Sequence, residues 1–315
     1  MTGGNLTRRM MGAGGLAAAL ALPGFARSQD PAPSFTNQNQ HRGLLTAAVM
    51  INDRGPYAFA IDSAANTSVI ARDLVVGLDL PDAGEVAMHT LIAEERAGTT
   101  RVARLRTGAL DAREARLVVS DRSGLEGLDG LLGTDLLRDL RLVLNFRGRA
   151  QVNVARSPRA RRGLAGAQLI ARAPGEQRFN GLLMVEAMAG FLPCKAIVDT
   201  GAQATVINTA LAQQGGARPM VQQDGSSRGG VESVTGRKAL ADLMLLPELQ
   251  LGGIRLTQAP VLVGDFHAFD LWGLSDQPAL LLGLDILSLF QTVVIDLRRG
   301  ELLLRPWRAH LAPGR

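Results

Sequence analysis

The sequence predicts a mainly β protein built from two homologous lobes, and three observations lead to this fold class. Residues 41–155 and 177–308 repeat one order of apolar runs, turn residues and polar positions. Within each repeat the apolar runs are short and are interrupted by turn residues every several positions, which favours strands over long helices. The chain of 315 residues also holds 36 glycines and only 4% aromatic residues, a mixture typical of many strands and tight turns.

Residues 1–26 have the pattern of a cleaved export signal. Arg8 and Arg9 precede an apolar run that ends at Leu22, and Pro23, Gly24, Phe25 and Ala26 close the segment. A short membrane anchor is the alternative, but the run is too short to span a bilayer comfortably, and no second apolar segment of spanning length follows. The paired arginines are typical of the twin-arginine export route. We therefore expect cleavage after Ala26 and a periplasmic or secreted protein without a membrane span in its mature form.

Three further segments are predicted to connect or flank the repeats. Residues 27–40 are polar and hold two prolines, so they are expected to form a flexible lead-in. Residues 156–176 are rich in Arg, Pro, Gly and Ala and are expected to form a linker. Within it, a short strand at residues 169–171 is an open alternative. Residues 309–315 are expected to form a tail.

Charge and cysteine content argue against two classes of protein. The formal net charge is +5 and stays mildly positive without the export signal, which argues against a dedicated nucleic-acid binder. The arginines of the predicted linker lack the interleaved aromatic residues that stack on bases, so we interpret them as solvated. The single cysteine, Cys194, cannot form an internal disulfide, so the chain is not a disulfide scaffold and depends on its core.

A single aspartate ends an apolar strand in each repeat, Asp62 in the first and Asp199 in the second. An unpaired buried carboxylate is costly, so each aspartate needs a partner or a proton. The residues that follow the aspartates are small or carry a hydroxyl group: Ser63, Ala64 and Ala65 in the first repeat, and Thr200, Gly201 and Ala202 in the second. Because the two aspartates occupy equivalent positions in the two repeats, we expect each carboxyl group to be the partner of the other.

Two leucines precede a glycine further along each repeat, at Gly133 and at Gly283. The pattern of a short helix follows each glycine, so one short helix per lobe is expected. Asp135 and Asp285 fall in the first turn of these helices, where an acidic side chain stabilises the helix dipole. The glycines are expected to let a strand pack closely behind each Asp loop.

These motifs resemble those of the retropepsin-like aspartic peptidases, in which Asp-Thr-Gly-Ala ends an apolar strand and apolar-apolar-Gly follows tens of residues later. The resemblance covers nearly the whole mature chain, in two copies. It implies the two-lobed fold of pepsin-like enzymes, with two closed β-barrel-like lobes and an active-site cleft between them. It also implies an aspartic endopeptidase that acts on polypeptides, needs no cofactor, and works as a monomer because both half-sites lie in one chain.

By this resemblance Asp62 and Asp199 form a catalytic dyad. Two carboxylates within hydrogen-bonding distance cannot both ionise, so the pair holds one proton over a wide pH range. The ionised member can take a proton from a water molecule, and the protonated member can donate to the substrate carbonyl oxygen. The sequence does not assign which aspartate is the base.

The residues beside the dyad fit supporting roles. The hydroxyl groups of Ser63 and Thr200 can bond across the lobe interface and hold both loops in place. Gly201 allows the backbone to pass close to a carboxylate. Ala64 departs from the family motif, which prefers Gly at this position. An alternative function therefore stays open: a protein with this fold that binds peptides without cleaving them.

Two regions match the hairpin flaps that cover the substrate in this family, residues 86–101 and 222–238. The second is rich in Gly and Ser, as a mobile lid requires. Residues 225–229 in this region also match the G-x-S-x-G pattern of serine hydrolases. That pattern requires a strand before it and a helix after it, so we interpret the segment as a loop.

The four histidines are scattered along the chain and have no metal-ligand spacing: His41, His89, His267 and His310. We therefore expect no metal site. Assembly with other proteins of the cell envelope is a third function that the two lobes could serve.

Overall fold

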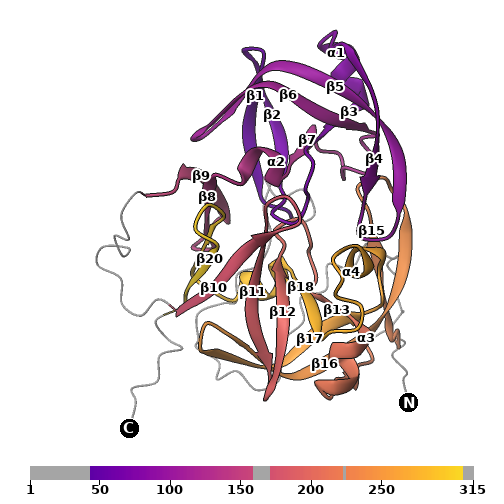
Figure 1. The fold of residues 1–315 in the computed structure, drawn as a ribbon, viewed down its shortest axis with the longest axis vertical. Helices are drawn as coiled ribbons and strands as arrows, with labels where there is room; N and C mark the ends of the chain where they lie inside the picture. Colours follow the sequence, from indigo (N-terminus) through magenta and orange to yellow (C-terminus); the bar gives the residue numbers. More distant parts are fainter. Residues whose placement is uncertain (1–42, 159–170, 223–224, 308–315) are drawn as a thin grey trace, which may run out of the picture.

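The computed structural model describes residues 43–158, 171–222 and 225–307 (Figure 1). The expected export signal, lead-in and tail lie outside these residues. The described residues form twenty strands and five short helices, and the lobes lie one above the other in Figure 1. The protein is therefore mainly β, as the sequence predicts.

Six strands of the first repeat close into a barrel. In hydrogen-bonded order they are β1 (Thr46–Ile51), β2 (Arg54–Ile61), β7 (Gly130–Leu132), β3 (Val69–Ala71), β6 (Leu110–Ser120) and β5 (Glu94–Thr107). Pairing of β1 with β5 closes the ring, and β4 (Asp82–His89) extends it beyond β5. The buried side chains of these strands fill the barrel interior, Phe59 and Ile61 of β2 among them.

Six strands of the second repeat form an equivalent ring. In order they are β11 (Leu182–Ala189), β12 (Leu192–Val198), β18 (Ala279–Leu282), β13 (Val206–Ile207), β17 (Ile254–Val263) and β16 (Lys238–Leu251). Pairing of β16 with β11 closes it, and two short strands, β14 (Arg218–Pro219) and β15 (Arg228–Glu232), add to β16. The order of the second ring matches the first strand for strand, which confirms the duplication.

The helices are short and more numerous than the sequence predicts. Helices α2 (Thr134–Leu137) and α5 (Leu284–Leu287) follow the two Leu-Leu-Gly motifs, as expected. Three others have no counterpart in the prediction: α1 (Arg72–Gly77), α3 (Thr209–Gln214) and α4 (His267–Leu271). One helix per lobe is therefore an undercount, because helices of five or six residues are too short to show a helical period in the sequence.

A third sheet joins the two lobes. Its strands run in the order β10 (Ala171–Arg178), β20 (Glu301–Arg305), β19 (Thr292–Asp296), β8 (Leu140–Asn145) and β9 (Gln151–Arg156). Strand β10 begins inside the expected linker 156–176, so the sheet starts earlier than the linker prediction implies. Strands β8 and β9 come from the first repeat, and they pair with the second repeat through β19.

The β8–β19 pair has the symmetry of a dimer interface. When the repeats are aligned on their Leu-Leu-Gly motifs, Thr292 is the counterpart of Leu142 and Ile295 is the counterpart of Asn145. Thr292 pairs with Asn145, and Ile295 pairs with Leu142. The register is therefore unchanged when the repeats are exchanged, as at an isologous interface between two identical chains.

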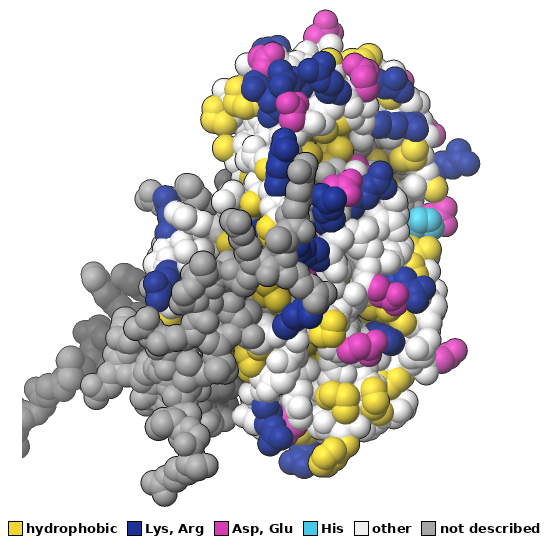
Figure 2. All heavy atoms as spheres, turned by 60° about the vertical axis from the view of Figure 1, so that its left-hand side comes forward, with side chains coloured by type: hydrophobic (Ala, Val, Ile, Leu, Met, Phe, Trp, Pro, Cys, Tyr) yellow, Lys and Arg dark blue, Asp and Glu magenta, His cyan; other side chains and the backbone are white. Residues whose placement is uncertain are grey.

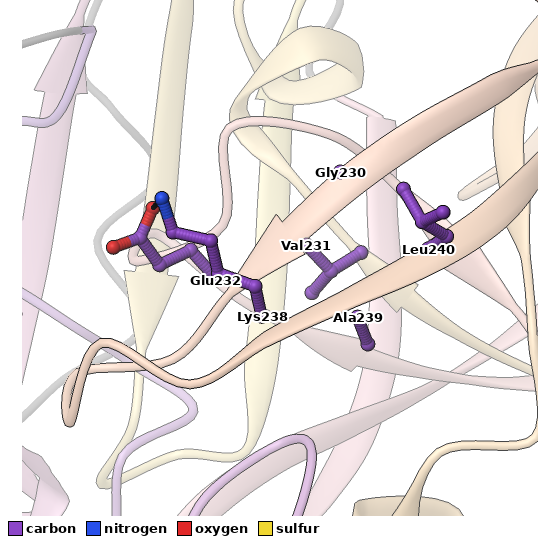
Figure 3. Close-up of a pocket in the computed structure, with 6 residues that line it drawn as sticks. All are labelled: Gly230, Val231, Glu232, Lys238, Ala239 and Leu240. Atoms are coloured by element: carbon purple, nitrogen blue, oxygen red, sulfur yellow. Dashed lines mark ion pairs between the residues drawn. The ribbon is translucent and has the colours of Figure 1, made fainter.

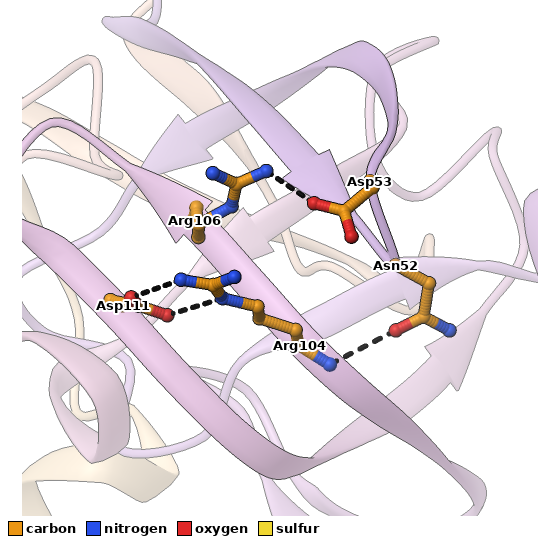
Figure 4. A network of polar contacts seen from close by, with 5 residues as sticks. All are labelled: Asn52, Asp53, Arg104, Arg106 and Asp111. Atoms are coloured by element: carbon orange, nitrogen blue, oxygen red, sulfur yellow. Dashed lines mark hydrogen bonds and ion pairs between the residues drawn. The ribbon is translucent and has the colours of Figure 1, made fainter.

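The outer surface of the first lobe carries exposed ion pairs (Figure 4). Arg104 holds Asp111 through two nitrogens, at 2.9 and 2.6 Å, and Arg106 pairs with Asp53. Figure 2 shows basic and acidic side chains interspersed over one face of the molecule. Solvated pairs of this kind contribute about 0–1 kcal/mol each, so the fold rests on its core and not on these contacts.

Candidate active site

Each of the two candidate aspartates directly follows a strand that pairs with a Leu-Leu-Gly strand. Asp62 follows β2, and its backbone N donates to Leu132 O at 2.9 Å. Asp199 follows β12, and its backbone N donates to Leu282 O at 3.0 Å. Because β2 and β12 run parallel to β7 and β18, the two aspartates leave their barrels in the same way.

The backbone of each Asp loop turns back on the carboxylate. Asp62 Oδ1 accepts from Ala64 N at 2.9 Å and from Ala65 N at 2.8 Å. In the second loop, Asp199 Oδ1 accepts from Gly201 N at 2.7 Å and from Ala202 N at 3.1 Å. The same oxygen, Oδ1, is therefore held by two backbone N–H groups in both loops.

Two buried hydroxyl groups lock the loops together across the lobes. Ser63 Oγ donates to Val198 O at 2.7 Å, and Thr200 Oγ1 donates to Ile61 O at 2.6 Å. Each hydroxyl oxygen also accepts from the other residue's backbone N, both at 3.1 Å. Ser63 and Thr200 are fully buried, so these four bonds are shielded from competing water. They form the reciprocal contact that the sequence predicts.

The two carboxyl groups interact directly, and each affects the pKa of the other. Burial raises the pKa of Asp62, and donation from the backbone of its own loop offsets part of the rise. Burial raises the pKa of Asp199 well above its ordinary range, and the negative charge of Asp62 adds to the rise. Two carboxyl groups that interact this closely titrate as a pair, which holds one proton over a wide pH range.

The position after each hydroxyl residue differs between the lobes. A Cβ atom on Gly201 would lie only 2.3 Å from Asp62 Oδ2, so a side chain there has no room. Its counterpart, Ala64, keeps the backbone bond to Asp62 and packs its methyl group against an apolar cluster of the second lobe that includes Ile197. The departure from Gly thus leaves the hydrogen bonding of the first loop intact.

A second pair of hydroxyl groups holds the far end of each Asp loop. Ser68 Oγ donates to Asp135 Oδ1 at 2.7 Å, and Thr205 Oγ1 donates to Asp285 Oδ1 at 2.7 Å. Burial raises the pKa of both carboxyl groups. Asp135 and Asp285 do lie in the first turns of α2 and α5, but they also tether the Asp loops, which the sequence analysis missed. The available signal was a hydroxyl residue six positions after each aspartate.

The glycines of the Leu-Leu-Gly motifs pack against the same loops. A Cβ atom on Gly133 would lie 2.7 Å from Ala65 O, and one on Gly283 would lie 2.7 Å from the carbonyl carbon of Ala204. Gly133 N donates to Ser68 Oγ at 2.9 Å. The predicted close packing behind each Asp loop is therefore confirmed.

Hairpins occupy both regions expected to form flaps, and each reaches the opposite lobe. The β4–β5 hairpin ends at residues 90–93, where Leu91 O accepts from Ala268 N of α4 at 3.2 Å. The β15–β16 hairpin ends at residues 233–237, where Val234 O accepts from Ser120 Oγ of the first lobe at 2.9 Å. Figure 1 places β4, β15 and α4 on the side of the molecule away from β8, β10 and β20.

The outer part of the β15–β16 hairpin holds a shallow, open pocket (Figure 3). Val231, Ala239 and Leu240 line it, and an ion pair between Glu232 and Lys238, at 3.5 Å, closes one end. None of its lining residues belongs to an Asp loop. The pocket is a feature of the hairpin and not part of the dyad.

The G-x-S-x-G match and the histidines lie in different structural surroundings. Residues 225–229 lead from a loop into β15, and no helix follows them, so the G-x-S-x-G match is not a nucleophile turn. Across 43–158, 171–222 and 225–307, no three His, Cys, Asp or Glu side chains are grouped to hold a metal ion. His41 and His310 lie outside the described residues, while His89 and His267 lie together and are not scattered.

No helix in the described part of the chain has the length and apolar character needed to cross a membrane.

Comparison with known proteins agrees with this geometry. The family model for aspartyl proteases matches residues 47–136 and 181–286, which together make up more than half of the chain. The chain therefore belongs to the aspartyl protease family, with one copy of the family unit in each lobe.

A search of curated proteins found no match. Among solved structures, the chain is similar to a retropepsin-like aspartic protease from Rickettsia conorii, with 19% identity and a TM-score of 0.29. That similarity covers 43% of this chain and 90% of the Rickettsia chain.

Proposed function

We propose that this protein is an aspartic endopeptidase that hydrolyses peptide bonds of extended polypeptides at the Asp62–Asp199 dyad. One observation carries the proposal: Asp62 and Asp199 come from different lobes, interact directly, and each has a pKa that burial raises. Membership of the aspartyl protease family supports it. Burying such a pair has a cost in stability, and a catalytic role accounts for that cost.

The chemistry proposed for the dyad is general acid–base catalysis. The ionised Asp62 takes a proton from a water molecule, whose oxygen attacks the peptide carbonyl carbon. The protonated Asp199 donates its proton to the carbonyl oxygen, which gives a neutral tetrahedral intermediate. As the carbon–nitrogen bond then breaks, the leaving nitrogen takes the proton held by Asp62. Asp199 recovers its proton from the intermediate hydroxyl group as the new carboxyl group forms.

The loops supply the rigidity that this exchange needs. Backbone N–H groups fix one oxygen of each carboxyl group, and the crossed bonds of Ser63 and Thr200 fix the distance between the loops. Small displacements of reacting groups are costly in rate. The hairpins at both flap regions would cover a bound polypeptide and exclude bulk water.

The test is hydrolysis of an unfolded protein by the wild type and by Asp199→Asn, assayed from pH 3 to 8. Loss of the acid is expected to lower kcat by about 100-fold or more, while the Asn side chain keeps the loop shape. Asp270→Asn, a change on α4 outside the dyad, is the matched control and should keep full activity. Equal rates for wild type and Asp199→Asn would sink the mechanism.

A peptide-binding protein without turnover is the second candidate, and Ala64 is the observation that favours it. This candidate predicts saturable peptide binding with no cleavage at any pH. Equilibrium binding of the same peptides to wild type and Asp199→Asn separates the two functions, because binding without turnover in both proteins supports the second.

We also propose export by the twin-arginine route and a monomeric working form. The arginine pair at the start of the chain and the presence of both aspartates in one chain support these proposals. Replacement of Arg8 and Arg9 by Lys should hold the protein in the cytoplasm as precursor, as cell fractionation would reveal. Light scattering of the purified mature form should give the mass of one chain.

A further inference from the structure

The first flap ends on a histidine pair that joins the two lobes. His89 is the last residue of β4, and His267 is the first residue of α4. His89 Nδ1 lies 3.1 Å from His267 Nε2. The rings are stacked, with centroids 5.4 Å apart and planes inclined by 22°. This contact connects residues 178 positions apart in the chain.

The pair lies where the flap tip meets the second lobe. Next to it, Ala268 N donates to Leu91 O at 3.2 Å. Leu91 and Ile92 pack against the apolar cluster that contains Phe269 and Trp272. The two imidazoles therefore lie beside the contact between the flap tip and α4.

A hydrogen bond between two imidazole nitrogens needs one donor and one acceptor. If both rings are protonated, no acceptor remains and two positive charges lie side by side. Imidazole changes charge between about pH 5 and 8. Glu94 Oε2 lies 3.9 Å from His89 Nδ1 and can offset one of the two charges. On the α4 side, Asp265 and Asp270 are hydrogen-bonded to other groups.

We propose that His89 and His267 form a pH-sensitive latch that holds the first flap over the cleft. The latch is closed while at least one ring is neutral, and it opens when both rings are protonated. The latch deepens the proposed function. It rests on that function for one consequence only, which is that an open flap admits a polypeptide. The contact itself can be measured without any turnover.

The second flap is held differently and serves as an internal reference. Glu95 of the first flap accepts from Thr235 Oγ1 at 3.0 Å and pairs with Arg237 at 3.1 Å. Ser120 Oγ donates to Val234 O. No imidazole takes part in these contacts. Within the second hairpin, Ser233 N donates to Arg237 O and Gly236 N donates to Ser233 O, both at 2.8 Å. Acid release of the histidine latch should therefore expose the first flap tip and α4, and leave residues 233–237 protected.

Hydrogen exchange, corrected for intrinsic rates, tests the latch at pH 7.5 and pH 5.0. The amide of Ala268 is the direct reporter, because its acceptor belongs to the flap. In the wild type, we expect protection of residues 266–272 to fall at least tenfold at pH 5.0. A fall of less than twofold would overturn the proposal.

Variants assign the effect to the two rings. His267→Gln retains a donor and an acceptor without a titrating charge, so protection should be the same at both pH values within about twofold. His89→Gln tests the same point from the other lobe if the first variant does not fold. Glu85→Gln, an exposed change on the same strand β4, is the matched control and should keep the wild-type response. A tenfold fall that persists in both Gln variants would show that the rings are not the switch.

Exchange and hydrolysis measured side by side on the wild type separate this inference from the proposed function. A pH-dependent latch in a wild type that cleaves no peptide at any pH would refute the proposed function alone. Peptidase activity with a flat exchange profile would refute the latch alone.

Discussion

Gly201 and Ala64 occupy equivalent positions in the two Asp loops, yet they have different room around them. A Cβ atom on Gly201 would collide with the carboxyl group of Asp62, whereas the methyl group of Ala64 packs against the apolar cluster of the second lobe. At the scale of single residues, the site is therefore asymmetric although the backbone bonds to both carboxylates match. Asp199, which is only 7% exposed, is the more strongly shifted acid.

Reciprocal substitutions at these two positions should have unequal effects. Gly201→Ala forces a methyl group into the dyad and should cost about 1–3 kcal/mol of stability, as overpacking does, with at least a tenfold loss of kcat/KM. Ala64→Gly should change kcat/KM by less than about threefold, because the loop bonds do not depend on the methyl group. Steady-state kinetics and urea unfolding of both variants check this. A larger loss from Ala64→Gly would contradict it.

Replacement of the raised-pKa acid Asp199 by its amide should stabilise the fold at neutral pH. The pKa of Asp199 is raised in the folded state, so the folded protein binds more protons than the unfolded chain. The associated stability is present below the unfolded pKa of about 3.9 and is lost as pH rises through the raised folded pKa. Asp199→Asn should therefore unfold at higher urea concentration than the wild type at pH 7, with a gain that shrinks toward pH 4. An equal gain at both pH values would argue against a raised pKa.

The Asp loops are held at both ends by elements from elsewhere in the same lobe. In the second lobe, Thr205 Oγ1 donates to Asp285 and accepts from Gly283 N at 3.1 Å. At the scale of the element, α5 is thus an anchor for the loop and not only a cap on the strand before it. Such anchors restrict the positions that the dyad can adopt.

Loss of this anchor should weaken both stability and catalysis. Thr205→Val leaves Gly283 N without its partner and removes one donor from Asp285, whose carboxyl group keeps the backbone N of Thr205 and of Ile286. An unsatisfied buried N–H group costs about 1–3 kcal/mol. Thr205→Ser keeps the hydroxyl group and should stay close to the wild type. Urea unfolding and kcat, measured for both variants, check the prediction. Equal stability and equal kcat for the Val and Ser variants would contradict the prediction, because they would show that the hydrogen bonds of the hydroxyl group do not hold the loop.

The molecule as a whole is joined by the shared sheet of β8, β19 and their neighbours. Leu144 and Val293 pair directly across the lobes and are fully buried. One continuous cluster of buried side chains extends through both lobes and this sheet. Because the core is shared, the lobes are expected to unfold as one unit.

A cavity in the shared sheet should therefore destabilise both lobes together. Leu144→Ala is expected to cost about 2–5 kcal/mol and to leave a single unfolding transition in calorimetry. The exposed Leu240, in the β15–β16 hairpin, is the control, and its change to Ala should cost less than about 0.5 kcal/mol. Two separate transitions in the Leu144 variant would show that the lobes are independent.

The sequence by itself determined the local chemistry of this protein. The duplication, the strands that end in Asp62 and Asp199, and the short helices after Gly133 and Gly283 follow from patterns within a few residues, as do the backbone bonds to each carboxylate. The tertiary structure decided which distant groups meet. Ser120 meets Val234 across 114 positions, and His89 meets His267 across 178. Such pairs leave no periodic trace in a single sequence, because their distance is set by how two closed barrels pack and not by their spacing along the chain.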